Sequence, residues 1–308
     1  MGKHNGLWQK IKANKDVYAM IFPGVLFLLV FAIYPLFWAF RYMFYDYDGF
    51  RERFTGLENF VRLFTRDVDF WHSVVNTLVY AGGKIIITIP LALILAILLN
   101  SKIKGKNLFR ITFFMPTITS TAVMSLIFYL IFNTYNGMIN QLLLKTGWVD
   151  KPIEWLGMNY AMLTAIIVAI WGAIGNYMIY FLAGLQSIPN DVYESAAIDG
   201  ANNFQKHIYV TIPMLGSITQ LVVMLAVILG LNGYESIMVL TGGGPNEATM
   251  VMYLYFYKKL FIFAETGVSA DMPQIGYGSA VAFVSSLIVG CITVIYLFWT
   301  KKSNQNMS

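Results

Sequence analysis

The sequence predicts an all-α polytopic membrane protein with six transmembrane helices, and two observations carry this prediction. Hydrophobic residues make up 57% of the 308 residues, charged residues only 12%, and the mean hydropathy is +0.62. Soluble domains have about 25% charged residues, so this chain has too few charges to cover the surface of a water-soluble globule. The chain also contains runs of the roughly 20 apolar residues that a helix needs to cross a bilayer. A cytosolic enzyme is therefore disfavoured.

The apolar runs define six spans, at about residues 17–42, 74–99, 109–132, 161–185, 215–240 and 277–300. They are continuous rather than alternating, which favours helices over the strands of a membrane barrel. A further apolar stretch, 249–263, is short and is interrupted by Lys258 and Lys259, so we expect a helix in the membrane interface. The first run is too long for a signal peptide, and no A-x-A cleavage site follows it. Residues 1–308 are expected to form one transmembrane domain, with an extracytoplasmic interfacial segment at 241–276.

The distribution of basic residues predicts the orientation. Lysine and arginine are concentrated in the N-terminal segment, in the second loop and at the C-terminus. Because short cytoplasmic loops are enriched in these residues, both termini are expected to be cytoplasmic. The first loop also carries four arginines on the opposite side, but the two densest basic segments decide the orientation.

The fourth loop, residues 186–214, is more elaborate than a connector between two spans requires. Pro189 suits a first-turn position, and Gly200 is placed to end a short helix. Asn202 or Asn203 can cap a second helix. The pattern predicts a helix, a glycine turn and a second helix. This pair could simply link two spans, or it could dock a cytoplasmic partner.

Several segments resemble one family. Glu194–Ser195–Ala196, Gly200 and Val210–Pro213 resemble the EAA motif of binding-protein-dependent ABC importer permeases, with Ser195 in place of an alanine and His207 where an aromatic residue is common. FTGLENF, FLAGLQSIP and VLTGGGPNEAT, in order and at matching separations, are similar to segments of the carbohydrate-uptake branch. The resemblance covers almost the whole chain.

This resemblance implies the type I ABC importer permease fold and a place in the cytoplasmic membrane of a prokaryote. It implies four kinds of partner: a second, different permease subunit, a cytoplasmic ATPase dimer, an extracytoplasmic solute-binding protein and a sugar, in contact with membrane lipid and without nucleic acid. ATP and Mg²⁺ would bind the ATPase, because the chain has no G-x-x-x-x-G-K-[ST] segment and is expected to bind no cofactor itself. The coupling residues would be Glu194, Ser195, Ala196, Asp199, Gly200 and Pro213.

Polar and aromatic groups inside spans are candidates for the substrate pathway. Lys84 and Glu235 are the charges that lie away from the span ends, and they could pair or could both line the path. Alternatively, Lys84 reaches the interface and Glu235 caps a broken helix. Asn and Gly within 231–235 predict a break in the fifth span, where family members often bind sugar. The candidates are Lys84, Trp171, Asn176, Tyr177, Asn232, Tyr234 and Glu235.

The glycine-rich loop after the fifth span has two interpretations. The resemblance implies contact with the binding protein or the pore mouth, whereas the plain alternative is a tight turn. Its residues are Thr241, Gly242, Gly243, Gly244 and Pro245.

Other functions receive less support from the sequence. A self-sufficient secondary transporter usually shows repeated halves, which are not visible here, and an intramembrane enzyme would need a catalytic constellation. No His or Cys spacing predicts a metal site. An oligosaccharide is the expected substrate, with glycerol-phosphate-type solutes as the alternative, since no arginine lies deep in a span to hold a phosphate.

Overall fold

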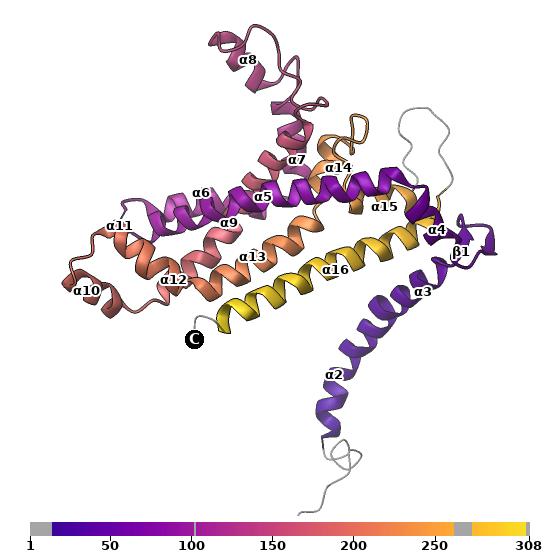
Figure 1. Ribbon diagram of the computed structural model, residues 1–308, viewed down its shortest axis with the longest axis horizontal. Coiled ribbons are helices and arrows are strands. Elements are labelled where there is room, and N and C mark those ends of the chain that lie inside the picture. The colour runs from indigo at the N-terminus through magenta and orange to yellow at the C-terminus, as the bar shows by residue number, and fades with distance from the viewer. Residues whose placement is uncertain (1–13, 102, 262–272, 306–308) are drawn as a thin grey trace, which may run out of the picture. The chain divides into compact units, whose positions relative to one another are not determined.

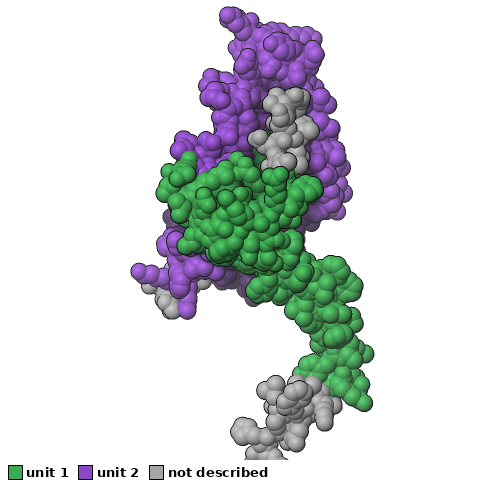
Figure 2. Space-filling model, turned by 90° about the vertical axis from the view of Figure 1, so that its right-hand side faces the viewer, with its two compact units in different colours: residues 1–66, 258–283 green, residues 67–257, 284–308 purple. Residues whose placement is uncertain are grey.

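The computed structural model describes residues 14–101, 103–261 and 273–305 and is mostly helical (Figure 1). Within these ranges, five helices are long and apolar enough to cross a membrane, and a bent pair of shorter helices would make a sixth span. The helical membrane class predicted from composition is therefore confirmed. The chain divides into two compact units, residues 1–66 with 258–283 and residues 67–257 with 284–308 (Figure 2).

The first unit begins with the first span, which is helical from Lys15 to Tyr42. Its parts are α2 (Lys15–Leu28), the π-helical turn η1 (Leu29–Ile33) and α3 (Tyr34–Tyr42). A small antiparallel hairpin of β1 (Tyr45–Tyr47) and β2 (Glu52–Phe54) follows, and then α4 (Glu58–Thr65). The all-helical prediction did not include this hairpin.

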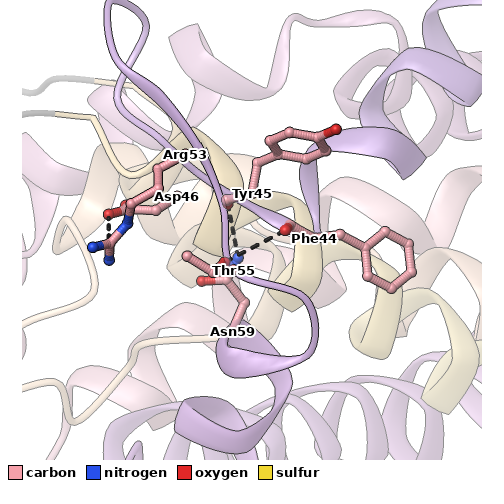
Figure 3. Close-up of polar contacts among 6 residues, drawn as sticks. All are labelled: Phe44, Tyr45, Asp46, Arg53, Thr55 and Asn59. Carbon is pink, nitrogen blue, oxygen red and sulfur yellow. Dashed lines mark hydrogen bonds and ion pairs between the residues drawn. The ribbon is translucent and has the colours of Figure 1, made fainter.

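Side chains close the hairpin and join it to α4. Asp48 Oδ1 accepts backbone N–H bonds from Arg51 (2.6 Å) and Phe50 (2.9 Å), and these bonds lower the pKa of the Asp48 carboxyl. The buried Asn59 side chain donates from Nδ2 to the Tyr45 carbonyl at 2.9 Å, and Arg53 lies 3.8 Å from Asp46 (Figure 3). These polar contacts hold the hairpin together with the ring contacts of Tyr45 on Phe54 and of Tyr47 on Tyr42.

The second unit is built on α5 (Val68–Asn100), α9 (Ala161–Gln186) and α13 (Gly216–Leu231). α5 and α9 are the helices in most extensive contact, and their core includes the fully buried Ala92, Ala96 and Phe181. Small residues let helix backbones approach closely in a membrane, which explains the alanines at this interface. The core therefore holds together the helices that carry the candidate pathway residues.

The third apolar run supplies two helices rather than one straight span. α6 (Lys106–Ile118) and α7 (Thr121–Ile131) meet at 99°. The break lies at Thr119 and Ser120, whose backbones leave the helical conformation a few residues after Pro116. α8 (Met138–Lys145) follows in the next loop.

The fifth apolar run is also broken, here at the predicted place. α13 ends at Leu231 and α14 (Glu235–Leu240) begins three residues beyond Asn232. The short apolar stretch interrupted by lysines forms α15 (Met252–Leu260), and α16 (Ile275–Gln305) is the last span. Lys3, Lys10, Lys12, Lys102, Glu265 and Asp271, which bear on the predicted orientation, lie outside the described residues.

Candidate functional site

A cavity of about 410 Å³ lies in the second unit, where the two broken spans meet α5 and α9. Broken helices in a membrane expose backbone and polar groups to a cavity rather than to lipid. Six of the predicted pathway residues line this cavity: Lys84, Asn176, Tyr177, Asn232, Tyr234 and Glu235. The fold thus brings together groups that are up to 151 positions apart in the chain, the separation of Lys84 and Glu235.

Some polar groups around the cavity are hydrogen-bonded to each other, and one is not hydrogen-bonded. The hydroxyls of Tyr80 and Ser236, both nearly fully buried, lie 3.0 Å apart and bond to each other. Asn232 Oδ1 is buried without a hydrogen-bond partner. An unpaired buried acceptor is costly, and Asn232 is therefore a cavity residue whose side-chain oxygen is not satisfied by the described residues.

Aromatic faces accompany these polar groups. Tyr234 lies 5.6 Å from Tyr257 between ring centroids, at an interplanar angle of 35°. Tyr177 is 2% exposed, so it belongs to the packed wall as much as to the cavity. Trp171 does not line the cavity; it lies edge-on to Phe128 at 5.2 Å and is 45% exposed.

Lys84 and Glu235 line the same cavity without forming an ion pair. The ion pairs Arg41–Glu52 and Arg53–Asp46 belong to the first unit and involve neither of these charges. Glu235 opens α14, where the helix dipole favours an acid. The two charges therefore border one cavity without being paired, and the position of Glu235 also fits the alternative in which it caps a broken helix.

Several cavity residues were not singled out from the sequence. The hydroxyls of Thr117, Thr119 and Thr121 lie at the break between α6 and α7, and Tyr80 and Ser236 are on α5 and α14. The threonines follow Pro116 inside an otherwise apolar run, which is a readable signal of a broken span. Nothing local marks Tyr80, because tyrosine is common in membrane helices.

The fourth loop forms the predicted helix, glycine turn and second helix, but Pro189 is the N-cap residue, one position before the first turn in which it was expected. α10 (Asn190–Ile198) ends before Gly200, whose φ of +81° is the left-handed conformation that favours glycine. Asn202 caps α11 (Asn203–Lys206) with a capping box. The Gln205 N–H donates to Asn202 Oδ1, and the Asn202 N–H donates to Gln205 Oε1, both at 2.9 Å.

The surface of this loop is open. Glu194, Ser195 and Asp199 are exposed, Ala196 is half-buried, and Pro213 is exposed in α12 (Ile212–Met214). α10 has no buried residue, and the Ile198 side chain is 87% exposed. Glu194, Ser195 and Asp199 are therefore accessible on the surface of α10 and its C-terminal end.

The glycine-rich loop is held by side chains. Thr249 Oγ1 lies 2.7 Å from Thr241 Oγ1 and donates to the Gly244 carbonyl at 2.8 Å. Asn76 of α5 donates to the carbonyls of Glu247 and Met250, both at 3.0 Å. Gly242 and Gly243 have φ of +61° and +92°. Gly244 and Pro245 border an open groove of about 660 Å³. The loop is therefore more strongly tied to the bundle than a plain turn requires.

Membrane-length helices around a cavity lined by polar and aromatic side chains, with an exposed helix pair on one connecting loop, are consistent with a membrane transport subunit. Residues 88–307 match the family described as binding-protein-dependent transport system inner membrane component, and the chain belongs to that family.

Curated relatives match over nearly the full chain. The arabinooligosaccharides transport system permease protein AraP of Bacillus subtilis is 34% identical and is covered over 90% of its length by 94% of this chain. The multiple sugar-binding transport system permease protein MsmF of Streptococcus mutans is 35% identical, with 92% of this chain and 94% of MsmF covered.

Among solved structures, a chain of a bacterial ABC transporter involved in the import of the acidic polysaccharide alginate has the same fold. Its TM-score is 0.81 at 22% identity, with 96% of this chain and 98% of that chain covered.

Proposed function

We propose that the chain is the membrane-spanning permease subunit of an ABC importer that moves a carbohydrate, specifically an oligosaccharide, across the cytoplasmic membrane. It acts with a second, different permease subunit, an ATPase dimer on the cytoplasmic side and an extracytoplasmic binding protein that delivers the sugar. ATP and Mg²⁺ bind the ATPase, and the permease itself catalyses no reaction.

The cavity at the two broken spans is the observation that carries this proposal. It offers hydroxyl and amide groups together with tyrosine faces, and sugars are held in proteins by such a combination of hydrogen bonds and apolar contact. Relatives over most of the chain bear names that refer to arabinooligosaccharides and to multiple sugars, which supports the same substrate class.

The exposed fourth loop supports the coupling part of the proposal. α10 presents Glu194, Ser195 and Asp199 on an unpacked surface, and Gly200 turns the chain back toward α13. Because α10 has no buried residue, its exposed surface is open to a partner. Seated on the ATPase, α10 would carry the partner's closure into the membrane as a rigid-body movement.

One variant tests the cavity directly. In the importer assembled with its partner subunits in proteoliposomes, Asn232→Leu should lower sugar uptake roughly two- to tenfold, the range of one neutral hydrogen bond. Thermal stability of the complex should hold, because the Asn232 oxygen already lacks a partner.

Ser125→Ala is the matched control. The Ser125 hydroxyl is equally buried and unpartnered but does not line the cavity, so uptake should stay at the wild-type rate. Unchanged uptake by Asn232→Leu would remove this residue from the pathway, and uptake that needs no ATPase subunit would favour a secondary transporter instead.

A further inference from the structure

The buried hydroxyl of Thr211 contacts the exposed loop helix α10. Thr211 is the last residue of the π-helix η2 (His207–Thr211), and it is fully buried. Its Oγ1 lies 3.1 Å from the Tyr193 hydroxyl of α10 and 3.3 Å from His207 Nδ1, and it donates to the Lys206 carbonyl at 3.3 Å. Thr211 therefore connects α10 to the helix that follows Gly200.

The three contacts match what one hydroxyl can make. A threonine hydroxyl has one hydrogen to donate and two lone pairs that accept. With its hydrogen directed to the Lys206 carbonyl, Oγ1 is left to accept from the Tyr193 O–H and the His207 Nδ1–H. The Lys206 carbonyl is five residues back, so the Thr211 hydroxyl bridges the widened turn. Such π-turns occur frequently at functional sites.

Tyr193 joins α10 to the rest of the second unit by two kinds of contact. Its ring packs against the hydrophobic core formed by α5, α9 and α13, while its hydroxyl reaches Thr211. Because α10 has no buried residue, it has little packing of its own to hold it in place. η2 is the helix that α10 contacts most extensively.

The neighbourhood of this contact is not tightly filled. A cavity of about 210 Å³ separates Tyr193, His207 and Thr211 from Asn100 and Ser101 at the end of α5. Close packing would by itself hold α10 in position, but here one side of the contact is open. The hydrogen bonds therefore carry a larger share of the positioning.

We propose that Thr211 is the positioning residue that transmits movement of the loop helix α10 into the membrane. Force on α10 passes through the Tyr193–Thr211 contact into η2 and α12, and then along α13 to Asn232 at the cavity. This inference rests on the proposed coupling role of the fourth loop and adds to it the contact through which the loop acts.

Thr211→Val tests the inference, because valine keeps the shape of threonine and removes the hydroxyl. In the reconstituted importer, sugar taken up per ATP hydrolysed should fall roughly five- to thirtyfold, the shift expected from losing one or two hydrogen bonds. ATPase subunits should remain bound, since α10 keeps its exposed contact residues. Thr211→Ser retains the hydroxyl and should restore the ratio.

Thr293→Val in α16 is the matched control, because the Thr293 hydroxyl bonds to the Val289 carbonyl of its own helix and so joins no two helices within the described ranges. It should leave uptake per ATP unchanged. A wild-type ratio in Thr211→Val would overturn the inference, as would an equal loss in Thr293→Val. If Thr211→Val does not assemble, Tyr193→Phe decides, and an unchanged ratio there likewise overturns it. A wild-type importer with no ATP-dependent uptake would instead refute the proposed function itself.

Discussion

Replacing Gly200 with valine places a β-branched residue in a backbone conformation that valine rarely adopts. Gly200 has a φ of +81°, and a Cβ added there would meet no atom within 4 Å. The penalty therefore comes from the backbone alone and not from a collision. It amounts to about 1–2 kcal/mol for an L-residue in the left-handed region, and this is larger for β-branched side chains.

This penalty acts on the angle between α10 and α11, because Gly200 lies between them. A cost of that size lowers the population of the observed turn roughly five- to thirtyfold. Insertion into the membrane should be normal, since no span contains Gly200. ATPase activity stimulated by the sugar-loaded binding protein, measured in proteoliposomes, should fall by a comparable factor.

Two controls separate the turn from general damage. Gly200→Asn should keep most of the stimulated activity, because asparagine tolerates the left-handed conformation. Gly147→Val applies similar strain in another loop, at a φ of +71° and also with nothing within 4 Å, and should leave the stimulation intact. Normal stimulation and uptake by Gly200→Val would refute the reasoning.

Three further substitutions have definite expected outcomes. Lys84→Met removes a cation from the cavity and should lower uptake about tenfold without loss of thermal stability, because a buried charge is itself costly; wild-type uptake would contradict this. Gly175→Ala drives a Cβ into the backbone of Phe113 and should destabilise the protein by about 1–3 kcal/mol in thermal unfolding, whereas Gly290→Ala, with open space, should not. Asn140→Leu removes the buried amide that bonds to two backbone carbonyls and to the Trp155 indole N–H. Because these groups are left unpaired, the free energy of unfolding should fall by about 1–3 kcal/mol. An unchanged unfolding curve would show that water replaces the amide.

The sequence is most informative where the controlling interactions are local. The apolar runs predict the long helices because any segment that crosses a bilayer must satisfy its backbone internally. The glycine turn at Gly200 and the cap at Asn202 are also predicted, since each depends on a few adjacent residues. The break after Leu231 follows from Asn and Gly inside an apolar run.

Features that depend on distant contacts could not be predicted in this way. The 99° bend between α6 and α7 needs a neighbouring surface on which to turn, and composition does not encode its direction. Tyr80 and Ser236 meet across 156 positions, so neither is recognisable alone. Trp171 looks like a stacking surface by residue type, but its contact in the fold is with Phe128.

ATP dependence of sugar uptake tests the central claim most directly. Proteoliposomes containing the permease with its partner subunits would be supplied with labelled oligosaccharide and binding protein, with or without internal ATP, after ionophores have abolished ion gradients. The proposed function predicts uptake only when ATP is present and hydrolysed. Uptake that proceeds without ATP and stops when the gradients are removed would contradict it.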